Sequence, residues 1–357
     1  MILPKETVML APLSALYGAL TRARLALYRA GALPVHRIEA PVISVGNLTA
    51  GGTGKSPLVA WVARAVAREG LRVCILTRGY GRAHPKSRVI VSDGERILAG
   101  PLEGGDEPCM LAEMLLGKAA VISDADRVGS ARWAVENLKS EVFILDDGFQ
   151  HLRIARDLNL VLLDATNPWG GRRLLPRGTL REPRENLSRA DCIVITRADQ
   201  ADNIASLRAE IESLSGSRPI FLSHIASQRA RPLFAASIRE EAEAMIRSQP
   251  VAAFCAIGNP QAFFMQLRRR GSILLSHTRA FSDHHVYTQS DVDQLEREAR
   301  EHGARLLVTT AKDAVKLRAL CFELPCLVLE IEIGFDEEDG FLSLIEKAVR
   351  QRRQAKV

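Results

Sequence analysis

The chain has 357 residues, 47% hydrophobic and 25% charged, which is enough for two globular domains with substantial cores. Its net charge of +6 suits an anionic partner such as a phosphorylated substrate or an anionic membrane. We expect no nucleic-acid partner, because no segment combines basic with aromatic residues as nucleic-acid modules do. Six cysteines without a CxxC pair or a metal-ligand spacing fit a reducing cytosol.

Residues 1–35 differ from the rest of the chain. A nearly uncharged run at 8–20 is followed by Arg22, Arg24 and Arg29. The run is shorter than the roughly 20 residues that span a bilayer. Most of the charge follows it, whereas a signal peptide carries its charge first. The pattern favours a helix lying on an anionic membrane surface, and the alternative is a helix packed on the protein's own core.

A glycine-rich segment comes next, between an apolar run at 42–45 and a helical pattern at 57–66. Strand, glycine-rich loop, Lys-Ser and helix form the layout of a phosphate-binding P-loop. Lys55 would reach the outer phosphates of a nucleotide, and the Ser56 hydroxyl would ligate Mg²⁺. Thr49 stands where the strict pattern has glycine. The predicted nucleotide-binding residues are Thr49, Ala50, Gly51, Gly52, Thr53, Gly54, Lys55 and Ser56.

Apolar runs alternate with helical patterns along most of the chain. This alternation predicts a mostly parallel sheet covered by helices on both faces. The runs lie at 42–45, 73–76, 121–122, 142–145, 160–163, 193–195 and 220–222, and the clearest helical patterns lie at 58–67, 109–116 and 204–214. A second α/β section has apolar runs at 251–257, 306–309 and 327–333.

We therefore predict a P-loop NTPase-type α/β/α sandwich with a second, smaller α/β domain and an N-terminal membrane-associated helix. The expected divisions are the helix at 1–35, the P-loop domain at 36–222, a connecting segment at 223–250 and the smaller domain at 251–357.

In such folds ligands bind at the carboxyl ends of the strands, so the residues after each apolar run matter most. Asp146 and Asp147 follow the run at 142–145. An apolar strand that ends in acid is the Walker-B arrangement, in which a carboxylate holds Mg²⁺. Two adjacent carboxylates are costly to place together without a cation between them. An Asp-Gly turn is the alternative interpretation.

Other polar residues follow the remaining strands. Asp106 precedes the helix at 109–116, where it would either cap the helix or deprotonate an attacking hydroxyl. Tyr80 lies in an Arg/Gly loop, and Arg127 follows the strand at 121–122. Four arginines at 172–181 suit a phosphorylated partner or a solvated loop. An Asp-His-His cluster at 283–285 indicates either a metal site or an Asp–His relay.

Together these motifs resemble one family, the tetraacyldisaccharide 4'-kinases of lipid A biosynthesis. The family's own P-loop lacks the first glycine, so Thr49 agrees with the resemblance. The matching segments occur in order over most of the chain, at 46–56, 78–81, 105–108, 146–151, 180–183, 258–260, 281–285 and 312–317.

The resemblance implies transfer of the γ-phosphate of ATP to the 4'-hydroxyl of an acylated glucosamine disaccharide 1-phosphate, which forms lipid IVA. It also implies a peripheral protein on the cytoplasmic face of the bacterial inner membrane. Asp106 would be the base, assisted by His284, with Lys55 and Asp147 in the same catalytic set. The implied Mg²⁺ ligands are Ser56, Asp146, Asp147 and Glu182, and the implied substrate or phosphate contacts are Tyr80, Arg127 and Arg181.

The chain departs from the family pattern at Ser282, at Ala311 and in the segment 167–171, all outside the implied catalytic set. Two other classes of P-loop protein are the alternatives. A membrane-associated partitioning ATPase would lack a second domain with an Asp-His-His cluster. A GTP-dependent metal-insertion chaperone would need Asn-Lys-x-Asp, which residues 196–199 only faintly echo, so adenine is favoured over guanine.

Overall fold

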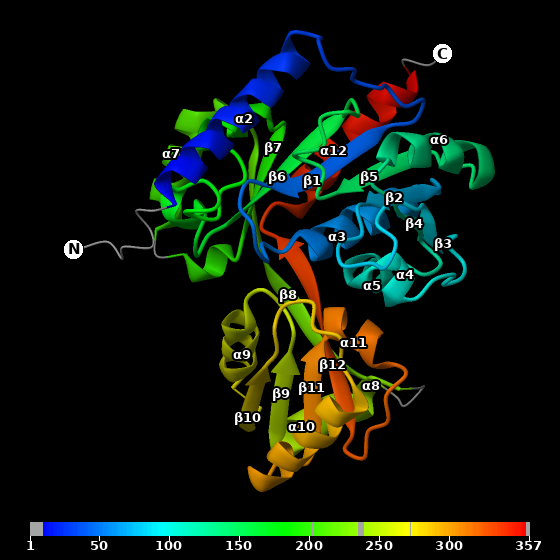
Figure 1. Ribbon diagram of the computed structural model, residues 1–357, viewed down its shortest axis with the longest axis vertical. Coiled ribbons are helices and arrows are strands. Elements are labelled where there is room, and N and C mark those ends of the chain that lie inside the picture. Colours follow the sequence, from blue (N-terminus) through cyan, green and yellow to red (C-terminus); the bar gives the residue numbers. More distant parts are fainter. Residues whose placement is uncertain (1–9, 202, 235–238, 272, 355–357) are drawn as a thin grey trace.

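The computed structural model describes residues 10–354, apart from 202, 235–238 and 272. Its described strands form one twelve-stranded sheet in the order β10-β9-β11-β12-β8-β7-β6-β1-β5-β2-β4-β3. The sheet runs through a larger and a smaller lobe, and β8 (Ile220–Pro232) and β12 (Cys326–Phe335) pass between them (Figure 1).

The larger lobe is a parallel sheet with helices on both faces, which confirms the predicted fold class. Its strands are β1 (Val42–Asn47), β2 (Val73–Thr77), β3 (Val89–Ser92), β4 (Ala119–Ser123), β5 (Val142–Asp146), β6 (Leu158–Asp164) and β7 (Cys192–Thr196). Only β3 at the edge pairs antiparallel among these described strands. Its helices are α3 (Lys55–Arg68), α4 (Pro101–Gly104), α5 (Asp106–Met114), α6 (Arg127–Asn137), α7 (Ile204–Ser215), η1 (Gly170–Arg172), η2 (Arg184–Arg189) and η3 (Ala198–Gln200).

Burial on both faces explains why the strands read as continuous apolar runs. Ile43 and Val45 of β1 enter the core shared with α3 and α5, whereas Val42 enters the core shared with α6. Because successive side chains of a strand point to opposite faces, most positions are apolar when both faces are covered.

The smaller lobe repeats this arrangement on a smaller scale. Strands β9, β10, β11 and β12 are parallel to one another. The other elements of this lobe are β9 (Val251–Cys255), β10 (Leu275–Ala280), β11 (Leu306–Thr310), α8 (Arg239–Ser248), α9 (Pro260–Arg269), α10 (Gln289–Glu301) and α11 (Ala311–Leu317).

The link between the lobes differs from the predicted connecting segment at 223–250. Strand β8 continues well past residue 222 and pairs antiparallel with β12, from Pro232 opposite Leu327 to Ser223 opposite Phe335. Its partly exposed middle carries polar side chains that bond across the pair, such as Ser227 to Glu332 (2.7 Å). A strand of this kind lacks a continuous apolar run, so the residues at 223–232 do not show the signal by which a buried strand is predicted from sequence.

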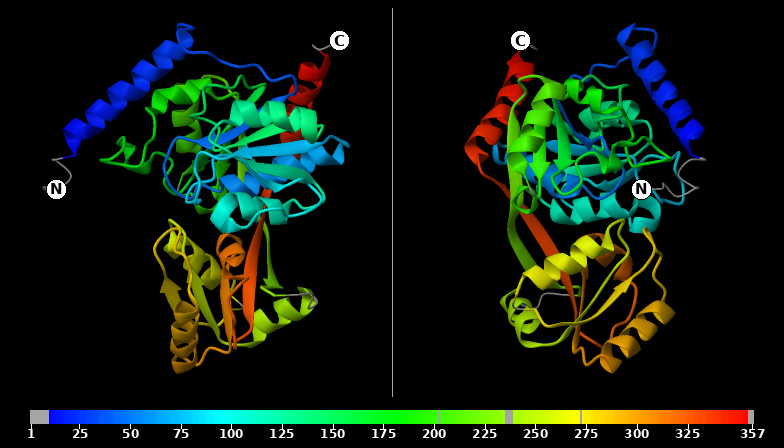
Figure 2. Two further views of the ribbon diagram at one scale, coloured as in Figure 1. Left: turned by 45° about the vertical axis from the view of Figure 1, so that its right-hand side comes forward. Right: turned by 90° about the vertical axis from the view of Figure 1, so that its left-hand side faces the viewer.

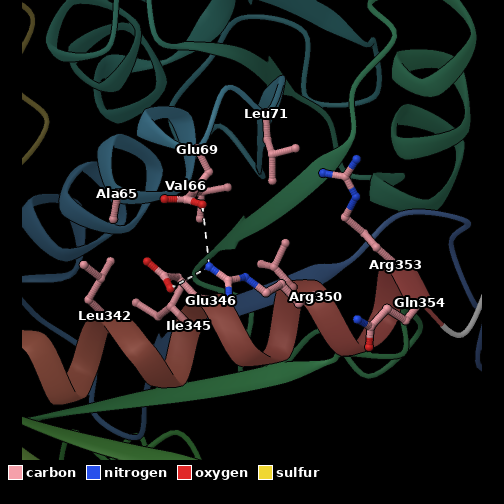
Figure 3. A pocket seen from close by; sticks show the side chains of 11 residues that line it. Ala65, Val66, Glu69, Leu71, Leu342, Ile345, Glu346, Arg350, Arg353 and Gln354 are labelled. Atoms are coloured by element: carbon pink, nitrogen blue, oxygen red, sulfur yellow. Dashed lines mark hydrogen bonds and ion pairs between the residues drawn. The ribbon is translucent and has the colours of Figure 1, made fainter.

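The C-terminal helix α12 (Glu338–Gln354) also departs from the predicted division, which placed 251–357 in the smaller domain. It returns to the larger lobe and packs on α3, because its apolar face joins the core of that lobe. A pocket of about 260 Å³ lies between α12 and α3 (Figure 3). Arg350 bridges Glu69 (3.9 Å) and Glu346 (3.1 Å) there, and the pocket contains none of the predicted site residues.

Helix α2 (Ala11–Arg29) lies on the outside of the larger lobe (Figure 2). It is bound on one side, where Ser14 donates to the carbonyl of Leu174 (2.8 Å) and Tyr17 to that of Arg181 (3.0 Å). Its other side exposes leucines, including Leu16 and Leu20. Within the described part of the chain, no helix is long and apolar enough to cross a bilayer. The rest of the predicted segment, 1–9, lies outside the described residues.

Substitution of Phe341 by alanine should strongly destabilise the protein. The ring is fully buried and packs against Trp61 of α3 (5.3 Å between centroids) and Phe335 (4.5 Å). Removing a buried phenylalanine costs about 3–5 kcal/mol of unfolding free energy. Denaturant unfolding measures this loss. The control is Phe234→Ala, whose ring is 40% exposed, and an equal loss in both variants would contradict the packing described here.

Candidate active site

Asn47, the last residue of β1, holds the P-loop together. Its fully buried side-chain amide donates to the carbonyl of Thr49 (2.7 Å) and to the hydroxyl of Thr53 (2.8 Å). Its Oδ1 accepts from the Lys55 ammonium (3.2 Å). One asparagine therefore fixes the beginning, middle and end of the loop, which organises the backbone before any phosphate binds.

The conformation of the loop explains both its glycines and its unusual threonine. Gly51 and Gly54 have φ of 116° and 84°, in the left-handed region that favours glycine. Thr49 is not among the residues with positive φ. It forms an isolated bridge with Leu180, and its buried side chain lies beside Gly170. Glycine is therefore not required at position 49.

The two carboxylates that follow β5 have different partners. Asp146 is buried and its Oδ2 accepts from the Thr77 hydroxyl (3.0 Å). Asp147 has a left-handed backbone (φ 51°) and accepts two hydrogen bonds of 2.7 Å from the Arg181 guanidinium. The Lys55 ammonium lies 3.7 Å from Asp147 Oδ1.

These surroundings separate the pKa values of the neighbouring acids. Burial, then the charges of Glu107 and Asp147, raises the pKa of Asp146 to about 6. Burial also acts to raise the pKa of Asp147, but the Arg181 hydrogen bonds and the Lys55 charge outweigh it and hold that pKa well below its usual range. Negative charge is therefore concentrated around Asp146, and a bound cation would offset it.

Asp106 and His284 come together from opposite lobes. Asp106 begins α5, and its Oδ2 lies 3.2 Å from His284 Nδ1. On the other side of the ring, the Lys312 ammonium lies 3.3 Å from Nε2. An ammonium can only donate, so Nε2 accepts and Nδ1 carries the proton that it donates to Asp106. His284 also has a left-handed backbone (φ 60°), a strained conformation of the kind concentrated at functional sites.

A cavity of about 550 Å³ separates the lobes at this point. Its lining combines the P-loop with residues of the smaller lobe. Of the predicted site residues, it is lined by Ala50, Gly51, Gly52, Thr53, Gly54, Lys55, Ser56, Tyr80, Arg127, Asp146, Asp147, Arg181 and His284. Thr49 supports the loop from behind, and Asp106 bonds to a lining residue.

Glu182 lies apart from this set. It is buried, and its Oε2 accepts from Asn186 (2.7 Å) and from Arg189. Arg127 is buried and donates to the carbonyl of Asp147 (3.3 Å), and burial lowers the pKa of its guanidinium. Tyr80 is half exposed, with the Arg78 guanidinium 5.2 Å from its ring.

The donors present fit a magnesium ion. Mg²⁺ binds one or two carboxylates together with phosphate oxygens and water, and Asp146, Asp147 and Ser56 offer such hard oxygen atoms at one cavity wall. Among the described residues, no group of three or more His, Cys, Asp or Glu side chains is arranged to hold a metal. Phosphate oxygens and water would therefore complete the coordination.

A P-loop facing two aspartates at the end of a neighbouring strand is typical of proteins that bind a nucleoside triphosphate for phosphoryl transfer. The chain matches the family described as Tetraacyldisaccharide-1-P 4'-kinase over residues 6–350, and it belongs to that family.

Individual relatives agree. The tetraacyldisaccharide 4'-kinase of Desulfotalea psychrophila is 40% identical over 88% of this chain and 89% of its own length. That of an Anaeromyxobacter species is 43% identical over 88% and 84%. The crystal structure of LpxK from Aquifex aeolicus in complex with ATP is 31% identical, covers 96% of this chain and 99% of its own, and superposes with a TM-score of 0.76.

Three residues of the segments that match the family, Asn47, Lys312 and Lys316, had no predicted role. Asn47 directly precedes the loop and is buried, so only its contacts show what it does. Lys312 and Lys316 are four residues apart, which places them on the same face of α11. This spacing predicts that both lysines face the same neighbouring element, which the structure shows to be α5.

Replacing Asn47 with alanine should weaken ATP binding. The P-loop would lose two neutral hydrogen bonds worth about 1 kcal/mol each and the bond from the Lys55 ammonium, so the Kd for ATP should rise about 30-fold or more. Titration calorimetry measures the change. The control is Asn159→Ala, which removes another buried asparagine bonded to the carbonyl of Arg189 (3.0 Å). A similar rise in Kd in the control, or none in Asn47→Ala, would refute this role.

Proposed function

We propose that this protein transfers the γ-phosphate of ATP to the 4'-hydroxyl of a tetraacylated glucosamine disaccharide 1-phosphate, which yields lipid IVA. The observation that carries the proposal is the contact between Asp106 and His284 beside a cavity that the P-loop lines. A P-loop protein that only hydrolysed its nucleotide would need no such pair from two lobes. Membership of the 4'-kinase family supports this choice of acceptor.

In this proposal Asp106 is the general base. It takes the proton of the 4'-hydroxyl while the oxygen bonds to the γ-phosphorus and the bond from that phosphorus to the leaving ADP breaks. The Nδ1–H group of His284 donates a hydrogen bond to the Asp106 carboxylate and fixes the orientation of that carboxylate. The reaction depends on positioning, because phosphoryl transfer asks little covalent chemistry of the protein.

The donor side follows from the P-loop wall of the cavity. Lys55 binds the outer phosphates, and Asp146, Asp147 and Ser56 hold Mg²⁺. When bound, Mg²⁺ neutralises charge on the phosphates. Arg181 now binds Asp147 through both terminal nitrogens, so it stands within reach of any phosphate that approaches this carboxylate.

Two further residues suit the acceptor side. Arg127 lines the cavity as a buried cation and would bind a phosphate or sugar oxygen. Tyr80 lines the same cavity, and its half-exposed ring can stack against a sugar.

A lipid substrate requires access from a membrane, and α2 is suited to provide it. Its bound side contacts Arg181 through Tyr17, so the helix adjoins the segment that enters the cavity. Its outer side carries Leu13, Leu16, Leu20 and Leu27, which are between 47% and 61% exposed. An apolar stripe flanked by arginines binds an anionic surface without crossing it. We place the protein peripherally on the cytoplasmic face of the inner membrane.

Asp106→Asn should strongly slow phosphate transfer and leave nucleotide binding intact. The amide keeps the shape of the side chain but cannot accept the hydroxyl proton, so kcat should fall about 10²- to 10⁴-fold. The assay follows labelled phosphate from ATP into the acylated disaccharide 1-phosphate. Glu113→Gln, on the same helix but paired with Arg318 (2.8 Å), is the control. Unchanged transfer by Asp106→Asn would exclude it as the base.

The double substitution Leu16→Glu and Leu20→Glu should reduce membrane binding. Two carboxylates would replace the apolar contact and would be repelled by anionic lipid. Co-sedimentation with vesicles containing phosphatidylglycerol measures binding, which should fall about tenfold or more. Leu274→Glu is the control, because Leu274 is 65% exposed but directly precedes β10 of the smaller lobe. Equal binding of both variants and the unchanged protein would rule out this role for α2.

A further inference from the structure

A lysine of α11 reaches the proposed base from the smaller lobe. The side chain of Lys316 is 7% exposed, and its ammonium lies 3.1 Å from Asp313 Oδ1, 3.1 Å from the carbonyl of His285 and 3.5 Å from Asp106 Oδ2. The ammonium donates a hydrogen bond to the His285 carbonyl and forms ion pairs with the two carboxylates. Two carboxylates from different lobes therefore share one buried cation.

Asp313 fixes this lysine to the core of the smaller lobe. Asp313 is fully buried, and its other oxygen accepts from the Thr310 hydroxyl (2.7 Å) and from the backbone N–H of Ala256 (3.1 Å). These bonds attach it to the carboxyl ends of β11 and β9. The ammonium of Lys316 is thus held at a set position rather than at the end of a freely moving chain.

We propose that Lys316, anchored by Asp313, is a positioning residue for phosphate transfer that holds the Asp106 carboxylate and the His284 loop in one geometry. The inference rests on the proposed function. Lys316 neutralises Asp106 and binds the carbonyl of His285, next to the residue that donates to Asp106. Its removal would therefore loosen both members of the pair.

The other charges around Asp106 do not replace this contact. Glu107, the next residue of α5, is paired with Lys312 (3.6 Å). Lys312 also contacts Asp283 (3.2 Å) and His284 Nε2 (3.3 Å). It therefore acts on the far side of the imidazole, whereas Lys316 acts on the carboxylate oxygen that the imidazole contacts.

A separate ion pair joins α5 to the segment directly after α11, and this pair supplies a control. Arg318 of the segment after α11 binds Glu113 of α5 at 2.8 Å. It joins the same two lobes at the other end of α5, and neither residue contacts Asp106 or His284 in the described hydrogen bonds and ion pairs. A role limited to holding the lobes together would be shared by Arg318 and Lys316.

The test uses the double variant Lys316→Met with Asp313→Asn in the full chain. The double variant replaces the largely buried ion pair with two neutral side chains and leaves Asp106 its contact with His284, so the variant should fold. We expect kcat for transfer to the acylated disaccharide 1-phosphate to fall about 100-fold through misplacement of the base. The KM for the lipid and the Kd for ATP should change less than about threefold, because no ligand contact is removed.

Two further measurements separate positioning from stability. In the Asp106→Asn background the double variant should cause no further loss of kcat, because the residue it positions is gone. Arg318→Met removes a different contact between the lobes, and its kcat should stay close to that of the unchanged protein.

A double variant that keeps kcat within about threefold, or that loses as much in the Asp106→Asn background, overturns the role of Lys316 while the kinase activity stands. An equal loss of kcat in Arg318→Met also overturns it. If the unchanged protein transfers no phosphate to the lipid, the proposed function fails, and this inference fails with it.

Discussion

The antiparallel pairing of β8 with β12 is the constraint on which the rest of the structure depends. Strand β8 is parallel to β7 in the larger lobe, and β12 is parallel to β11 in the smaller lobe. Their antiparallel pairing makes the two sets of parallel strands run in opposite directions (Figure 1). Because ligands bind at the carboxyl ends of parallel strands, both binding edges then face one cleft. The cleft therefore combines the nucleotide site of the larger lobe with the polar residues of the smaller lobe.

Charged side chains on both sides of the cleft are held in fixed positions. Asp147 is held ionised by Arg181 and Lys55, whereas Asp146 is buried among acidic groups. On the facing side, lysines of α11 pair with acids of α5 across the lobes. A charged phosphate donor thus meets fixed cations rather than water, and such preorganised charge is the main resource of enzymes that transfer phosphoryl groups. The family assignment agrees with this arrangement.

Much of the fold was predictable because buried parallel strands leave a continuous apolar signal. The residues after these strands gave the P-loop, Asp146 and Asp147. The sequence could not reveal the course of β8, whose half-exposed polar stretch resembles a linker, or the return of α12 to the larger lobe. The pairing of Asp106 with His284, 178 positions later, leaves no local signal and was expected only from the family resemblance. The contact of Glu182 with Arg189 was not predicted, because the resemblance implied that Glu182 would ligate Mg²⁺.

The proposed reaction brings the γ-phosphate of ATP to a lipid hydroxyl in this cleft. The most direct measurement is mass spectrometry of the lipid after incubation of the protein with ATP labelled at the γ-phosphate, Mg²⁺ and the acylated glucosamine disaccharide 1-phosphate. The lipid should gain one labelled phosphate at the 4'-hydroxyl, with ADP formed in equal amount. Consumption of ATP with the lipid unchanged would contradict the proposed function.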